Sequence, residues 1–354
     1  MSQHQHHRFT VLDGMRGIAA IAVMFHHLTK YTSMSLFAGA GLAVDLFFCL
    51  SGFVIAFSYL GKLKHSMTTE QYILKRLVRL YPMYMIGLTL GCIALFLKVY
   101  ENKTSLDYPH AALACLLNAM YLPYLSDFYV GIANGKISSA TFPANDPSWS
   151  LFFEMIVNIV FGLIAYRARR VCFVLLAVIG AIGLALWIKA TWIFQPGWGA
   201  DNLYGGLPRV FYSFFAGVVV FFLFENYQKY IPSVSPIYLI GLLFALLVFQ
   251  ENAFSWLMLV IFVLPILVLL GAKSTTSNKF ATPLLDYIGW ISYPLYCIHW
   301  SIYSIFTSLS VNITSALSSL FVCVPVSFLL AHFISKKIEE PIRSRLAVSL
   351  LKSR

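Results

Sequence analysis

The chain has 354 residues, of which 59% are hydrophobic and 11% charged, against about 25% charged residues in ordinary soluble domains. This excludes a soluble globular fold, because a globule of this size needs a polar shell, and it predicts an integral membrane protein whose partner is the lipid bilayer. The formal net charge of +11 would suggest nucleic acid binding in a soluble protein, but here the basic residues gather beside apolar stretches, so no nucleic acid partner is expected.

Eleven apolar stretches are candidates for helices that cross or nearly cross a bilayer. They run over residues 14–28, 37–60, 80–97, 111–125, 149–166, 171–194, 210–224, 237–249, 254–270, 288–309 and 316–334. A helical span needs about 20 residues, or about 17 at the short end, so the first, fourth, seventh and eighth stretches are short. Length alone therefore does not fix the number of crossings.

The positions of the basic residues give a better count. Basic clusters lie in residues 61–79, 167–170 and 335–354, and basic loops are expected in the cytoplasm. All three clusters share one side only if the stretch 111–125, which Asn118 and Pro123 interrupt, does not cross. We therefore predict an all-α bundle of about ten transmembrane helices, with both termini cytoplasmic and residues 111–125 at the outer face. The outer side then holds Lys30, Lys98, Lys103, Lys136, Lys189 and Arg209.

The chain is expected to form a single membrane domain over residues 1–354, with spans from about 12 to 334 and a basic cytoplasmic tail over 335–354. Residues 98–148 form the longest non-spanning region and are the only external part large enough to help bind a substrate. The six cysteines lie scattered in apolar runs, which predicts neither disulfides nor a metal site.

Ionisable residues within the spans mark candidate functional positions, because they are costly in lipid. Arg16 and His27 are eleven residues apart, which on a helix returns to within about 20° of the same face, about 16 Å along the axis. Counting along the other spans places Asp45, Glu154 and His299 at about the depth of His27. A histidine with a carboxylate beside it is the minimal set for a general base and its orienting partner. A snorkelling arginine and a hydrogen-bonded core histidine are the alternative interpretations.

Arg76 and Arg79 are three residues apart and would share one face of a helix at the cytoplasmic end of the third stretch. Two guanidinium groups in this arrangement suit phosphate binding. Charges that only set the topology would explain them equally well.

Six motifs in order resemble the acyltransferase 3 family of membrane-bound acyltransferases. They are residues 12–17 with Arg16 and His27; 45–53, which begin at Asp45 and include Ser51; 76–82 with Arg76 and Arg79; Trp149 to Glu154; 291–299 with Tyr293, Tyr296 and His299; and Glu340 with Pro341. The resemblance runs from Phe9 to about Arg343. It implies a ten-helix bundle and transfer of an acyl group, most often acetyl, from cytoplasmic acyl-CoA to hydroxyls at the outer face. It matches the form of the family without a fused esterase-like domain.

By this resemblance His27 is the catalytic residue, Arg16 completes its motif, and Arg16, Arg76 and Arg79 are the residues expected to bind coenzyme A. We expect Glu154 or Asp45 to orient the imidazole. Supporting roles at the site fall to Ser51, Trp149, Tyr293, Tyr296 and His299. Acyl-CoA is then a co-substrate, with no permanently bound cofactor and no metal.

The expected acceptor is a sugar hydroxyl of a surface polysaccharide or of its lipid-linked precursor, and the expected location is the cytoplasmic (inner) membrane. The alternative function is a secondary transporter or flippase that uses the same histidines and carboxylates as a proton relay. Inverted repeats would favour a transporter, and the halves of the sequence show no internal symmetry. Direct transfer and an acyl-His27 intermediate both remain open.

Overall fold

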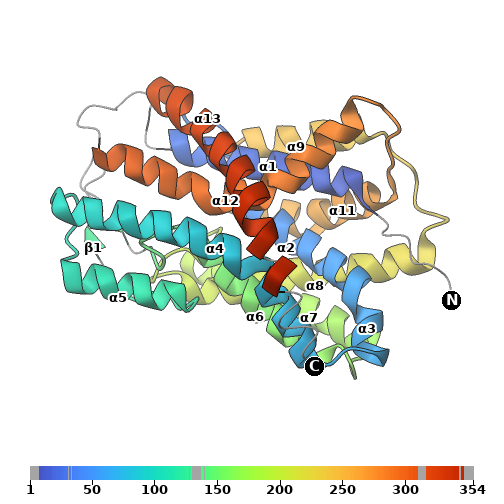
Figure 1. Ribbon diagram of the computed structural model, residues 1–354. Helices are drawn as coiled ribbons and strands as arrows, with labels where there is room; N and C mark the ends of the chain where they lie inside the picture. The colour runs from blue at the N-terminus through green and yellow to red at the C-terminus, as the bar shows by residue number, and fades with distance from the viewer. Residues whose placement is uncertain are drawn as a thin grey trace.

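The computed structural model describes residues 8–30, 32, 34–126, 128–129, 137–138, 140–309, 316–342 and 344–346. Within these residues the fold is helical, apart from a two-residue antiparallel pair of β1 (Phe128–Tyr129) with β2 (Ile137–Ser138). The prediction of an all-α protein is confirmed for this part of the chain. Figure 1 shows the long helices packed side by side, with the N-terminus and α3 toward the right of the view and α5 and β1 toward the left.

The helices have the following bounds. They are α1 (Thr10–Thr29), α2 (Gly41–Ile55), α3 (Gly61–His65), α4 (Thr69–Tyr100), α5 (Tyr108–Ala119), α6 (Ser148–Ile164), α7 (Arg170–Thr191), α8 (Leu203–Tyr227), α9 (Pro236–Val248), α10 (Ala253–Met258), α11 (Leu264–Lys273), α12 (Ala281–Leu309) and α13 (Ala316–Ile334). Three π-helical segments, η1 (Ala56–Leu60), η2 (Leu259–Val263) and η3 (Ser335–Glu339), follow α2, α10 and α13 directly.

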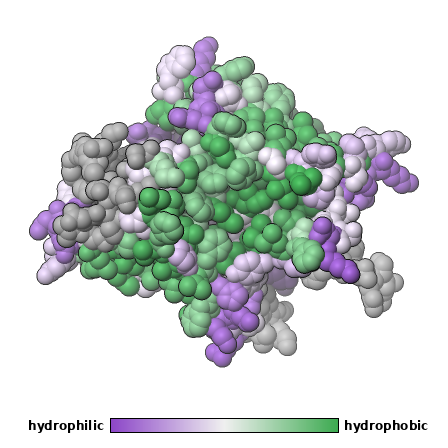
Figure 2. All heavy atoms as spheres, turned by 90° about the horizontal axis from the view of Figure 1, so that it is seen from above, coloured by the Kyte–Doolittle hydropathy of each residue, from purple (hydrophilic) through white to green (hydrophobic). Residues whose placement is uncertain are grey.

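Seven helices of the described chain are long and apolar enough to cross a membrane. They are α1, Gly41–His65, α4, α7, α8, Ala253–Lys273 and Leu317–Leu346. Figure 2 shows hydrophobic residues over the middle of one face, with hydrophilic residues gathered toward its edges. This arrangement is typical of a protein whose belt is solvated by lipid tails, and the chain is a multi-pass membrane protein.

The count of ten spans and the placement of the termini stay predictions. Two shorter apolar helices, α6 with 17 residues and α9 with 13, fall below the length of a standard span. The 29-residue α12 is long enough but carries polar residues along its buried face. The predicted non-crossing stretch 111–125 lies largely in α5, which has 12 residues and packs beside α4.

The centre of the bundle is α12, which packs against α1, α4 and α13. Two glycines let α1 and α12 approach closely. A Cβ on Gly17 would lie 2.6 Å from the backbone carbon of Ile288, and one on Gly289 would lie 2.7 Å from Cβ of Asp13. Small residues at a helix interface allow such backbone approach in membrane proteins. The close α1–α12 packing fixes which side chains of the two helices face each other farther along their length.

Candidate active site

A cavity of about 590 Å³ lies between the first half of α1, α2, the first part of α4, α6 and α12. Four arginines and two carboxylates are among its described lining residues: Arg8, Arg16, Arg76, Arg79, Asp13 and Glu154. Its other polar lining residues are Ser51, Ser58, Ser150, Ser292, Tyr293 and Tyr296. The structure thus brings the three arginines predicted to contact coenzyme A to one cavity, although they come from helices far apart in the sequence.

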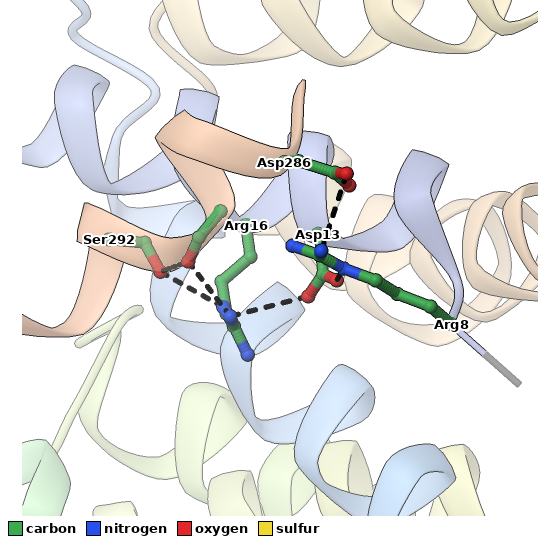
Figure 3. Close-up of polar contacts among 6 residues, drawn as sticks. Arg8, Asp13, Arg16, Asp286 and Ser292 are labelled. Carbon is green, nitrogen blue, oxygen red and sulfur yellow. Dashed lines mark hydrogen bonds and ion pairs between the residues drawn. The ribbon is translucent and has the colours of Figure 1, made fainter. Parts of the chain in front are cut away.

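Arg16 crosses from α1 to α12, as Figure 3 shows. Its Nε donates to Oγ of Ser292 at 2.9 Å, and its Nη2 donates to the carbonyl of Gly289 at 2.8 Å. Nη2 also lies 3.3 Å from Oδ1 of Asp13, one turn earlier in α1. These contacts hold the guanidinium against the cavity wall with Nη1 not hydrogen bonded to any residue the structure describes.

Arg8 extends this network toward the N-terminus. It lies 3.4 Å from Asp13 and 3.3 Å from Asp286 of α12, and Figure 3 shows it between the two carboxylates. More than half of its side chain is exposed, so these ion pairs add little stability. Sequence reasoning missed Arg8, since it lies just before the first apolar stretch and outside the paired motif.

Arg76 lies between two residues of α6. Its Nε donates to Oδ1 of Asn158 at 2.9 Å and its Nη2 to Oε1 of Glu154 at 3.3 Å. Ser51 of α2 donates to the same carboxylate oxygen at 2.9 Å. Glu154 therefore organises the cavity wall and joins α2, α4 and α6. Asn158 also accepts from the hydroxyl of Tyr72, and it was not among the predicted site residues.

Arg79 lies one turn farther along α4, beside α12. Its Nη1 donates to Oε1 of Glu339 at 3.3 Å, and its guanidinium carbon lies 5.8 Å from the centre of the Tyr293 ring. Tyr293 in turn donates to the carbonyl of Leu80 at 2.6 Å. Glu339, which is buried in η3, is a third site residue that was not predicted, because it follows the last apolar stretch and was assigned to the tail.

His27 meets His299 toward the opposite end of α1 from Arg16. Nδ1 of His27 lies 2.9 Å from Nε2 of His299, and Nδ1 of His299 lies 3.0 Å from the carbonyl oxygen of Leu295. The two rings are 5° from parallel with centroids 5.2 Å apart. The nitrogen–nitrogen distance is much shorter than the distance between the ring centroids, so the two nitrogens point toward each other from the facing edges of the rings. This is the geometry of a hydrogen bond in the plane of the rings. Trp300 packs its ring edge-on to His27 with centroids 5.3 Å apart.

The cavity and the histidine pair are linked through Tyr296. Its ring is part of the cavity lining, and its centroid lies 5.9 Å from that of the fully buried His299. The hydroxyl of Tyr296 is hydrogen bonded at 2.7 Å to Ser150, another lining residue. Tyr296 therefore joins the cavity to the histidine pair, although neither histidine is among the described residues that line the cavity.

Asp45 does not lie with His27, contrary to the prediction from depth. Arg209 of α8 donates to both of its oxygens, from Nε at 2.9 Å and from Nη2 at 2.8 Å, and Ser213 approaches at 3.3 Å. Asp45 and Arg209 are both fully buried, and the Trp149 ring lies 5.3 Å from the guanidinium. The depth of a residue along its helix does not say which side of the bundle the residue faces. Arg209 was predicted to be a charge on the outer side, so it was not considered as a partner of Asp45.

Glu154 does not lie beside His27 either. Its described partners are Ser51 and Arg76, on the cavity wall. The expected carboxylate at the imidazole is thus replaced by a second histidine, His299. The prediction that Asp45 or Glu154 orients His27 is not supported by this geometry, because both carboxylates are engaged by arginines.

The acyltransferase domain family known as acyltransferase 3 matches residues 9–333. Protein 2 in the picA locus of Rhizobium radiobacter is 35% identical over 193 residues, covering 52% of this chain and 96% of that protein. A candidate O-acetyltransferase of Staphylococcus aureus (strain COL), SACOL0978, is 23% identical over 353 residues, 94% of this chain. The peptidoglycan O-acetyltransferase OatA of Listeria monocytogenes is 23% identical over 355 residues, also 94% of this chain.

The chain spans 57% of the staphylococcal protein and 55% of OatA. No solved structure matches the chain. The family match covers nearly all the described helices, from the residue before α1 to the end of α13. It includes Arg16, Arg76 and Arg79 and both histidines of the pair, and it confirms the resemblance read from the motifs. The chain belongs to the acyltransferase 3 family.

Proposed function

We propose that the protein transfers an acyl group, in the simplest case acetyl, from acyl-CoA to a hydroxyl group. The observation that carries this proposal is one cavity that is lined by Arg16, Arg76 and Arg79 and approaches the His27–His299 pair through Tyr296. Two of the relatives are named as O-acetyltransferases, one of them acting on peptidoglycan, which favours a sugar hydroxyl as the acceptor. The proposed acceptor is a surface polysaccharide or its lipid-linked precursor.

The donor would bind with its phosphates at the arginines. Coenzyme A carries its anionic phosphates at one end and its thioester at the end of a long flexible arm, so its site needs cationic contacts for the phosphates and enough length for the arm. Arg16 and Arg76 each use Nε and Nη2 in described contacts, and Nη1 of each is not hydrogen bonded within the described chain. Each of these guanidinium groups is held in place by the protein and keeps Nη1 as a donor for a phosphate oxygen.

The acyl end of the donor would reach past Tyr296 toward His27. His27 withdraws the proton from the acceptor hydroxyl, whose oxygen attacks the thioester carbonyl. The carbon–sulfur bond breaks, and the thiolate takes the proton from His27 and leaves as the thiol. General base catalysis of this kind contributes about 10²- to 10⁴-fold to the rate. Attack by His27 itself, through an acyl-His27 intermediate, would use the same arrangement.

We propose that the acyl group is transferred across the cytoplasmic membrane, from a donor on the inner side to an acceptor on the outer side. Basic residues before α4, before α7 and after α13 favour a cytoplasmic position for the cavity arginines and both termini. His27, about 16 Å farther along α1, would then meet an acceptor from the outer side. Donor and acceptor enter from opposite faces in this arrangement.

The test uses purified protein in lipid nanodiscs with acetyl-CoA and a soluble glycan acceptor. Release of free coenzyme A thiol and mass spectrometry of the acetylated glycan report transfer. We expect His27→Ala to abolish transfer, and His26→Ala, its matched control one position away, to retain most of it. Full activity in a monodisperse His27→Ala variant would overturn the assignment of His27. A transporter using these residues as a proton relay would release no thiol at all.

A further inference from the structure

The hydrogen bonds around His299 determine which of its nitrogens carries a proton. A carbonyl oxygen can only accept, so the contact of 3.0 Å between Nδ1 of His299 and the carbonyl of Leu295 requires a proton on Nδ1. A neutral imidazole has one protonated nitrogen, which leaves Nε2 of His299 as an acceptor. A charged His299 is disfavoured, because this side chain is fully buried and its described contacts include no carboxylate.

The same argument passes to His27. Its Nδ1 lies 2.9 Å from Nε2 of His299, so Nδ1 of His27 must donate the proton of that hydrogen bond. In neutral His27 the other nitrogen, Nε2, then carries the lone pair. The carbonyl of Leu295 thus determines which nitrogen of His299 is protonated, and His299 in turn determines which nitrogen of His27 is protonated.

We infer that His299 is a positioning residue that locks His27 in the tautomer whose Nε2 accepts the substrate proton. This inference rests on the proposed function, in which His27 withdraws that proton. The opposite tautomer would present an N–H group at Nε2 and could neither take a proton nor attack a thioester. Fixing the tautomer is one of the two roles that a buried carboxylate performs in serine hydrolases, the other being to stabilise the imidazolium.

A neutral histidine suits this position in a membrane interior. A carboxylate at the same place would bring a buried negative charge, whose desolvation is expensive without a partner. Both Asp45 and Glu154 are held by arginines elsewhere, so neither is needed there. The Trp300 and Tyr296 rings, at 5.3 Å from His27 and 5.9 Å from His299, restrict rotation of the pair.

The proton balance of the transfer follows from this assignment. Nε2 of His27 takes the proton of the acceptor hydroxyl, and Nδ1–H of the resulting imidazolium stays hydrogen bonded to Nε2 of His299. The acceptor oxygen forms a bond to the thioester carbon, and the carbon–sulfur bond breaks. The coenzyme A thiolate then takes the proton from Nε2 of His27, which restores the neutral pair.

The direct test is ¹⁵N NMR of the full-length protein labelled at histidine in nanodiscs, with His27→Ala to assign the resonances. We expect His27 of the wild type to carry its proton on Nδ1. A His27 protonated on Nε2 overturns the inference while leaving the proposed function intact. An active His27→Ala variant overturns the proposed function instead, so the two failures are distinct.

Two substitutions separate tautomer control from packing. His299→Phe keeps an aromatic ring of similar size but cannot accept the proton of Nδ1, and we expect it to lower kcat by about 100-fold with little change in KM for acetyl-CoA. His299→Gln packs less well, but its amide oxygen can accept that hydrogen bond, so it should recover at least tenfold over His299→Phe. A purely structural role predicts the reverse order, and that order would overturn the inference. If both variants misfold, the wild-type NMR spectrum still decides.

Discussion

Two arginine–carboxylate pairs, Arg209 with Asp45 and Arg76 with Glu154, join helices of this bundle, and they differ in how completely they are closed. The first pair is at most 1% exposed, whereas the side chains of the second are 13% and 16% exposed. In the first pair every nitrogen of the guanidinium donates a hydrogen bond. Nε and Nη2 donate to Asp45, Nη1 donates to the carbonyl of Pro196, and Nη2 also donates to the carbonyl of Gly41. In the second, Nη1 of Arg76 is not hydrogen bonded within the described chain.

The difference shows what separates a structural ion pair from a binding site when the residue types are the same. The rings of Trp149 and Trp256 also pack near the guanidinium of Arg209, at 5.3 and 5.2 Å. Arg76 lines the cavity and keeps a donor available there. A phosphate can therefore add to Arg76 without breaking its existing contacts. The closed pair should determine stability and the open pair should determine donor affinity.

Asp45→Asn has the largest expected effect on stability. The substitution keeps the shape of the side chain but leaves the guanidinium of Arg209 as an uncompensated buried charge, which costs about 3–5 kcal/mol. We expect a strong fall in the thermal midpoint in detergent and in the yield of monodisperse protein. Glu154→Gln, the matched change in the open pair, should lower the midpoint much less. Equal losses at the two positions would contradict the comparison.

Replacing both members of the closed pair checks that Asp45 is structural. Exchange of a buried ion pair for apolar residues of similar size is often neutral or stabilising. The double variant Asp45→Leu with Arg209→Met should therefore regain most of the thermal stability lost in Asp45→Asn, and it should regain transfer activity. A stable double variant without activity would return Asp45 to the catalytic set.

Arg76→Ala and Arg79→Ala test the open side of the comparison. Charge-assisted hydrogen bonds are worth about 1.5–3 kcal/mol, so each variant should bind acetyl-CoA roughly 10- to 100-fold more weakly in calorimetry. S-acetylpantetheine, which lacks the phosphates, should be used equally well by the variants and the wild type. Unchanged acetyl-CoA affinity in monodisperse variants would show that these arginines only set the membrane topology.

The sequence predicted the parts of the site that depend on local helix geometry. The eleven-residue spacing of Arg16 and His27, and the three-residue spacing of Arg76 and Arg79, each lie within one helix, where position follows from periodicity. The partners were not predictable in this way. Arg209 meets Asp45 across 164 residues and His299 meets His27 across 272, and these contacts depend on how the helices pack.

Depth in the membrane was a partial guide to the fold and the site. It placed His299 at the level of His27, where the structure has it, but it placed Asp45 there as well. His299 and Asp45 differ in the direction in which each side chain points around its helix, and depth along the helix gives no information about that direction. The ten-span count is limited by helix length and polarity instead, because α6 and α9 are shorter than standard spans and α12, although it contains the apolar stretch 288–309, is not among the seven described helices apolar enough to cross.

Exchanging arginine for lysine at both sites gives the smallest and sharpest contrast. At Arg76 an ammonium keeps the charge but cannot contact Asn158, Glu154 and a phosphate in the fixed fork of a guanidinium. Loss of about one hydrogen bond, roughly 1 kcal/mol, should weaken acetyl-CoA binding about fivefold and leave the thermal midpoint nearly unchanged. Arg209→Lys removes donors that Asp45 and two buried carbonyls require, so it should lower the midpoint and leave donor affinity intact in the protein that folds. If Arg76→Lys is less stable and Arg209→Lys binds donor more weakly, the two pairs have the opposite roles from those that their burial and hydrogen bonding indicate.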